Sequence, residues 1–107
     1  MAITNYEIDT YMIYHMNVEN SYGQSAVVNC FKGGAFKGTL YFYREGASIP
    51  ASQKTSSGYL YLRFHEARYP EVVETLRHEK PLHIGFNDSN QWGWVATSSE
   101  PVGEEEG

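Results

Sequence analysis

The sequence has few of the features that cross-link a chain by disulfides or anchor it in a membrane. It holds one cysteine in 107 residues, so it can form no internal disulfide and its fold needs no oxidising compartment. No apolar run approaches the roughly 20 residues of a membrane span. The first fifteen residues include Glu7 and Asp9 and lack a basic segment before a continuous apolar run, which argues against a signal peptide. We therefore expect a cytoplasmic protein without membrane association.

Catalytic and cofactor motifs are also missing. The chain contains no GxSxG, HExxH or CxxC motif. The glycines of FKGG, residues 31–34, do not lead into a helix, so the geometry that cradles phosphate is absent. His65 and Glu66 are neighbours on a predicted strand and would face opposite sides. These absences favour a binding module over an enzyme, with no cofactor.

Four histidines do not predict a metal site. His15, His65 and His83 are expected on one face of the sheet. The order strand, helix, strand would place His65 and His83 roughly 15 Å apart along the sheet. A zinc ion needs its nitrogen ligands about 2 Å away, so we predict no bound metal.

Charge is unevenly distributed in this acidic chain. The net charge is −5, yet residues 32–63 carry five basic residues against one acidic residue. A basic central segment would help to bind phosphates, whereas the overall charge and acidic tail repel a polyanion at long range. The composition therefore permits nucleic-acid binding but disfavours it.

The strongest structural signal is a hairpin over residues 26–43. Two runs rich in β-branched and aromatic residues meet at Gly33 and Gly34, which suit a two-residue turn with positive φ. Counting outward from this turn separates two faces. The expected core face holds Val27, Phe31, Phe36, Leu40 and Phe42, and the other face holds Ala26, Val28, Cys30, Lys37, Thr39 and Tyr41.

Other segments predict four more strands and one helix. Residues 5–19 alternate throughout and predict a single strand with Met12 on the core face, and residues 58–65 predict a strand with Leu62 inward. Helical spacing then appears from Tyr69 to Leu76, with Pro70 in the first turn. Residues 82–86 and 91–98 form a final hairpin. Whether Trp92 and Trp94 are buried stays open; an even-length loop, which we favour, turns both outward.

These elements predict an α+β fold. Its order is β-β-β-β-α-β-β, a mostly antiparallel curved sheet with one short helix packed on one face. Residues 1–101 are expected to form a single globular domain and residues 102–107 a disordered acidic tail. A sheet that stays open and one that closes into a partial barrel are both compatible with this pattern.

The element order is similar in outline to the repeat unit of PUR-type and Whirly-type single-stranded nucleic-acid-binding domains. The similarity is a meander of four strands followed by a helix, over roughly residues 5–80. It implies single-stranded nucleic acid as an alternative partner and assigns no role to any individual residue.

The candidate binding surface is the sheet face turned away from the helix. Its expected members are Tyr11, His15, Val28, Cys30, Lys37, Tyr41, Tyr43, Tyr59, Tyr61, Arg63, Trp92 and Trp94. We expect association with a second copy or another protein, since monomers rarely expose so much apolar and aromatic surface. The alternatives are single-stranded nucleic acid and a small ligand or substrate in a pocket on this face.

Cys30 opposite Lys37 is the one pair with an argument for reactivity. A nearby cation stabilises a thiolate and would make the cysteine nucleophilic. The competing interpretation, which we favour, is that Cys30 only fills space in a semi-apolar surface.

The tail provides a first test. Deleting residues 102–107 should change the melting temperature by about 4 °C or less, because three glutamates flanked by glycines bury no apolar surface. Calorimetry of the full and truncated chains measures this. A much larger drop would show that the tail packs against the domain.

Overall fold

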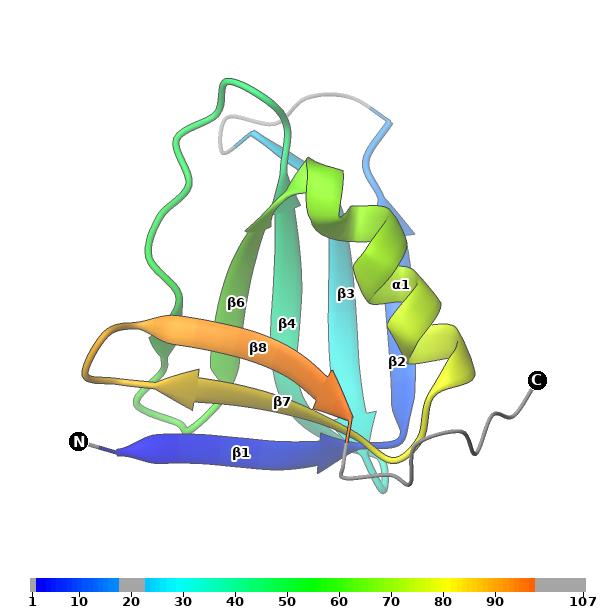
Figure 1. Ribbon diagram of the computed structural model, residues 1–107, viewed down its shortest axis with the longest axis vertical. Helices are drawn as coiled ribbons and strands as arrows, with labels where there is room; N and C mark the ends of the chain where they lie inside the picture. The colour runs from blue at the N-terminus through cyan, green and yellow to red at the C-terminus, as the bar shows by residue number, and fades with distance from the viewer. Residues whose placement is uncertain (1, 18–22, 98–107) are drawn as a thin grey trace.

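The computed structural model describes residues 2–17 and 23–97 (Figure 1). The elements, in chain order, are β1 (Ile3–Ile8), β2 (Thr10–His15), β3 (Gln24–Lys32), β4 (Ala35–Tyr43), β5 (Gln53–Lys54), β6 (Leu60–His65), the 3-10 turn η1 (Glu66–Arg68), α1 (Tyr69–His78), β7 (Leu82–Asn87) and β8 (Trp92–Thr97). The predicted tail, residues 102–107, lies outside the described residues, as does the end of the predicted strand over residues 5–19.

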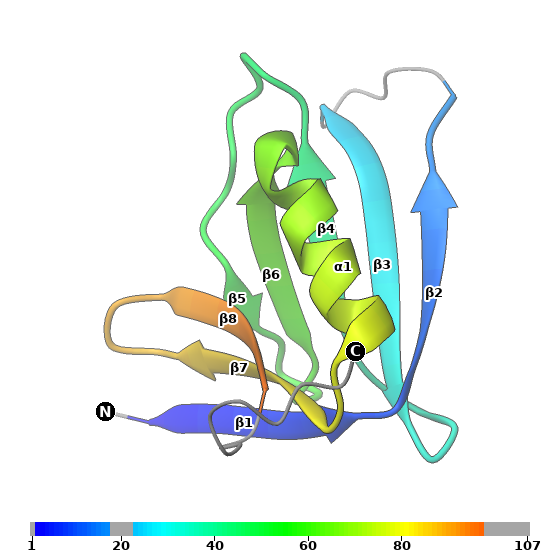
Figure 2. The same ribbon diagram turned by 45° about the vertical axis from the view of Figure 1, so that its right-hand side comes forward.

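The strands of the described residues form two sheets, and neither sheet closes on itself. The larger sheet has the order β2-β3-β4-β6-β5, and the smaller has the order β1-β7-β8. The small sheet and α1 lie side by side over the same face of the large sheet (Figures 1 and 2). The predicted α+β class, mostly antiparallel with a helix packed on one face, is confirmed.

The core fills the space between the large sheet and the two elements that lie over it, the small sheet and α1. Its fully buried members come from both sheets, among them Val28, Leu40, Leu62 and Ile84. The helix adds the predicted stripe of Val72, Val73 and Leu76, with Pro70 in the first turn. Burial of this stripe explains why the short helix is stable against the sheet.

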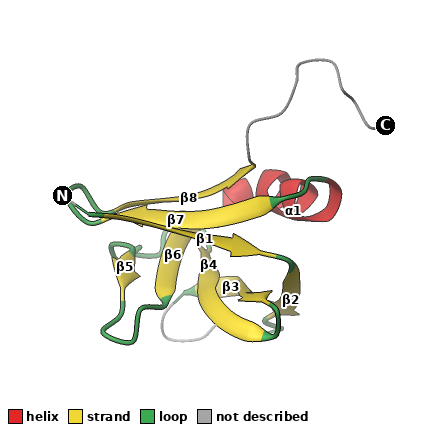
Figure 3. Cartoon of the chain, turned by 90° about the horizontal axis from the view of Figure 1, so that it is seen from below, coloured by secondary structure: helices red, strands yellow, loops and turns green. Residues whose placement is uncertain are grey.

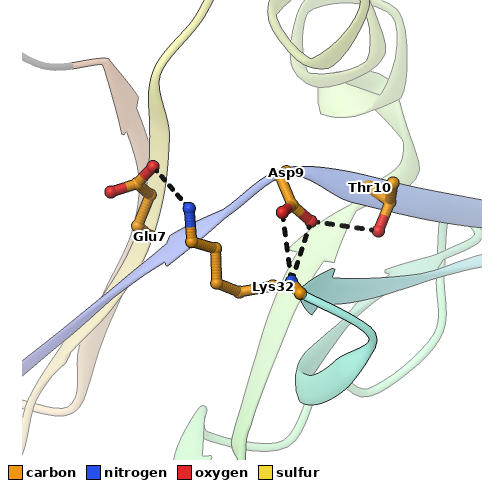
Figure 4. A network of polar contacts seen from close by, with 5 residues as sticks. Glu7, Asp9, Thr10 and Lys32 are labelled. Atoms are coloured by element: carbon orange, nitrogen blue, oxygen red, sulfur yellow. Dashed lines mark hydrogen bonds and ion pairs between the residues drawn. The ribbon is translucent and has the colours of Figure 1, made fainter.

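The predicted strand over residues 5–19 is wrong in one respect, because the chain leaves one sheet for the other at Asp9. Residues before Asp9 pair with β7 and residues after it pair with β3. The Asp9 amide donates to the carbonyl oxygen of Phe31 (2.8 Å), and its carboxylate accepts from the Gly33 amide (3.0 and 3.3 Å; Figure 4). Asp9 therefore ties the corner between the sheets to the tip of the β3–β4 hairpin.

The Gly33–Gly34 turn is confirmed, but the pairing changes a few residues from it. Both glycines have positive φ, +59° and +85°. Phe31 pairs with Phe36 as predicted, whereas Cys30 pairs with Gly38, so β4 contains one extra residue there. This β-bulge reverses the predicted faces of β3.

The predicted meander is wrong at its last step. β4 and β6 pair in parallel, and the chain between them forms β5 on the far side of β6. Gly38 permits this pairing, because a Cβ at that position would collide with the backbone carbonyl of Leu60.

The β7–β8 hairpin has the predicted even-length loop. Asn87 pairs with Trp92 across it, and Gly85 pairs with Trp94. Both tryptophans therefore face away from the core, as we favoured, and Trp94 covers Gly85.

Core packing predicts a large effect of truncating Leu62, whose side chain has no exposed surface and approaches Gly93 of the small sheet. Leu62→Ala should lower the free energy of unfolding by about 2–5 kcal/mol. Ile3→Ala, which shortens a side chain that is 59% exposed on the small sheet, is the control and should cost under about 1 kcal/mol. Urea denaturation measures both; similar losses would contradict the assigned faces.

Candidate functional site

The large sheet leaves one face without a helix or strand over it among the described residues (Figure 3). We call it the outer face. Its side chains follow from the strand registers and are Thr10, Met12, Tyr14, Val27, Asn29, Phe31, Phe36, Thr39, Tyr41, Tyr43, Gln53, Tyr59, Tyr61, Arg63 and His65. Aromatic side chains predominate, and Arg63 is the one Lys, Arg, Asp or Glu among these described members.

The outer face brings together five of the predicted site residues. Tyr41 and Tyr61 form an edge-to-face pair with ring centroids 5.6 Å apart. Arg63 Nη1 donates a hydrogen bond to the phenolic oxygen of Tyr43 (2.9 Å), but Tyr43 is only 1% exposed, so its predicted part in a binding surface is wrong. Tyr59 lies at the other end of the sheet against Phe36, with ring centroids 4.8 Å apart.

Tyr11 and His15 lie on the opposite side from the one predicted. Tyr11 packs against the core, and His15 Nε2 lies 3.0 Å from the hydroxyl of Tyr69 on the helix. The reason is the corner at Asp9, which shifts the alternation of β2 by one residue relative to β1.

Val28 and Cys30 are fully buried, so their predicted place on the binding face is wrong. The bulge in β4 turns them toward the helix and the small sheet. Cys30 pairs with Gly38 instead of Lys37, and burial raises the pKa of the Cys30 thiol from 9.0 to about 12. The reactive-thiolate hypothesis is therefore wrong.

The remaining three predicted residues lie away from the outer face. The Lys37 ammonium lies over the Tyr6 ring, 5.1 Å from its centroid, on the side of the small sheet. Trp92 and Trp94 lie on the far surface of the small sheet, where Trp94 donates a hydrogen bond from Nε1 to the Asn5 side chain (3.3 Å). Trp92 is 69% exposed.

Several outer-face residues were predicted as core instead, namely Met12, Val27, Phe31 and Phe36. The sequence carried a signal for this. Asn29 lies between Val27 and Phe31 on the same face, and it bonds to Thr39 across the strands (2.9 Å). A central polar residue is more compatible with a surface than with a core face.

Arg63 organises one end of the outer face. Its Nε donates to the Ala51 carbonyl (3.0 Å), and Nη2 donates to Gln53 Oε1 (3.2 Å). Its amide donates to Ser52 Oγ (3.0 Å), which is buried. These bonds hold the segment before β6 against the sheet.

A hollow of about 780 Å³ opens between this segment and the sheet. Its walls come from the start of β3, the outer side of β4 and β6, and the segment after β4. The lining residues are Gly23, Gln24, Tyr41, Tyr43, Arg44, Ala47, Ser48, Pro50, Tyr61 and Arg63. Burial is the main cause that raises the pKa of Tyr41, so its phenol stays protonated and neutral near pH 7.

Within the described ranges, no three His, Cys, Asp or Glu side chains gather where they could hold a metal ion. The helix found there is also neither long nor apolar enough to cross a membrane. No protein-family model, curated protein or solved structure matches this chain.

Burial of Cys30 predicts a specific pH dependence of stability. Above pH 9 the unfolded thiol loses its proton while the folded thiol keeps it up to about pH 12. The free energy of unfolding should therefore fall in this interval by up to about 1.4 kcal/mol per pH unit from this group alone. Urea denaturation of wild type and Cys30→Ala measures the difference in slope. Equal slopes would contradict the burial of the thiol.

Proposed function

We propose that this protein is a non-catalytic binding module that associates through the outer face, with a second copy of itself as the partner. The observation that carries the proposal is an aromatic and methionine-bearing face with a single charged side chain among its described members. Its β2–β3 half holds Met12 and Tyr14, which are 50% and 45% exposed. Depletion of charge with enrichment of aromatic residues and methionine is typical of interface cores.

The distribution of lysines supports self-association. Lys32 forms an ion pair with Glu7 (2.9 Å; Figure 4), and Lys37 lies over Tyr6, so both point toward the small sheet. The outer face is therefore close to neutral although the chain carries a net charge of −5. Two neutral faces meet without the like-charge repulsion that would oppose contact between acidic surfaces.

The size of the face also suits a dimer. Five strands about 4.8 Å apart and roughly 20–30 Å long give a face of roughly 500 Å². Two copies would bury about 1,000 Å² in total, at the lower end of specific interfaces. The expected complex is consequently a reversible dimer, arranged about a two-fold axis so that each copy uses the same residues.

Single-stranded nucleic acid is the weaker alternative. A stacking platform needs cations beside its aromatic rings to follow the phosphates. Of the basic residues that we expected to serve this purpose, Lys32 and Lys37 lie on the other side of the sheet. Arg63 on the outer face and Arg44 in the hollow beside it remain, and two cations are too little positive charge for a strand of phosphates.

Sedimentation tests the dimer. At about 100 µM the wild type should sediment at twice its 12.2 kDa, as expected for a dissociation constant near or below about 10 µM. Tyr14→Asp should give a folded monomer, because a carboxylate would lose its hydration in the contact without gaining a partner. Circular dichroism verifies that the variant is folded.

The matched control is Trp92→Asp, which introduces the same charge at an aromatic residue that is 69% exposed on the small sheet. It should remain dimeric. A monomeric wild type, or a dimer that Trp92→Asp disrupts and Tyr14→Asp does not, would contradict the proposal. Salt-sensitive binding of a short single-stranded oligonucleotide would favour the alternative.

A further inference from the structure

The hollow beside Arg63 has properties that self-association does not require. It lies at the β4–β6 half of the outer face, whereas Met12 and Tyr14 lie on β2 at the edge of the sheet. Its volume of about 780 Å³ falls within the range of small-molecule sites, roughly 300–1,000 Å³. The segment after β4, drawn in green on the left of Figure 1, forms its outer wall.

Arg63 is held in place before any ligand arrives. Its guanidinium group lies over two tyrosine rings, 5.2 Å from the Tyr41 centroid and 6.0 Å from the Tyr61 centroid. Of its five N–H donors, three bond to Ala51, Gln53 and Tyr43. The other two donors have no partner among the described residues, and a guanidinium fixed in this way loses little conformational entropy when it binds an anion.

The wall of the hollow has a net positive charge. Arg44 and Arg63 both line it, and the described lining residues include no Asp or Glu. Two cations facing a shared, partly enclosed space favour an anion there, because low local dielectric strengthens the attraction. Tyr41 and Tyr61 supply flat apolar surface and hydroxyl groups beside this charge, whereas Tyr43 is buried and accepts a hydrogen bond from Arg63.

We propose that the hollow binds a small planar aromatic anion. Its ring packs against the Tyr41 and Tyr61 side chains, and its acidic group lies between Arg44 and Arg63. The ligand is a small molecule rather than a nucleic-acid strand, since Arg44 and Arg63 are the two cations among the described residues of the hollow and the outer face. The inference can be tested apart from dimerisation, because Tyr14→Asp, the variant that should break the dimer, changes no residue that lines the hollow.

Calorimetric titration with two probes of one shape tests the charge requirement. Naphthalene-2-sulfonate is negatively charged, and naphthalene-2-methanol is a neutral molecule of similar shape. The sulfonate should bind at least about tenfold more tightly, and added salt should reduce that preference. Equal affinities, or tighter binding of the alcohol, would overturn the proposal.

Variants locate the site. Arg44→Gln should remove most of the preference for the sulfonate, while Lys54→Gln, which removes the same charge from an exposed residue outside the hollow, should leave it unchanged. Tyr41→Leu should weaken both probes by a similar factor, because it removes ring surface and no charge. This third variant keeps the test decisive if Arg44→Gln does not fold.

The monomeric Tyr14→Asp variant separates this inference from the proposed dimer. It should bind the sulfonate as the wild type does. Loss of binding in that variant, or a preference that survives in Arg44→Gln and disappears in Lys54→Gln, would contradict the assignment. A wild type that is monomeric yet binds the sulfonate with the expected preference would refute only the dimer.

Discussion

The architecture depends on how Asp9 holds the corner between two sheets. Its amide donates to Phe31 and its carboxylate accepts from Gly33, so one residue fixes the end of β1, the start of β2 and the tip of the central hairpin. With the hairpin fixed there, the small sheet lies across the same face of the large sheet as α1 (Figure 2). One side of the large sheet is thereby buried, and the other has no helix or strand over it among the described residues.

The arrangement of the two sheets also separates the lysine side chains from the outer face. The lysines at the hairpin tip contact the small sheet, Lys32 through Glu7 and Lys37 over Tyr6. The outer face keeps one guanidinium group, that of Arg63, and uses it to hold the segment around Ser52. The result is a surface with two distinct halves: an exposed, nearly neutral edge around Met12 and Tyr14, and a positively charged, tyrosine-lined hollow. This contrast is why we propose the dimer and the ligand separately.

Local signals in the sequence predicted the elements better than their faces. The helix follows from the spacing of Val72 and Leu76, and the hairpin turn follows from Gly33, because both depend on neighbours in the chain. The faces of β2 and β3 depend on single-residue shifts at Asp9 and Lys37, which arise where distant strands meet. Gly38 inside a strand was the local sign of the bulge. For β6, the sequence predicted correctly that Tyr61 and Arg63 point away from the core. Val28 and Cys30 were assigned to the wrong face because of the extra residue at Lys37.

Hydroxyl-radical footprinting at low and high protein concentration tests the central claim, that the outer face is where this protein associates. Met12 reports on that face, and Trp92 reports on the small sheet; both side chains are well exposed in the single chain, at 50% and 69%. If the account is right, oxidation of Met12 falls as the concentration rises while oxidation of Trp92 stays constant. Protection of Trp92 with Met12 unchanged, or no protection of either residue, would contradict it.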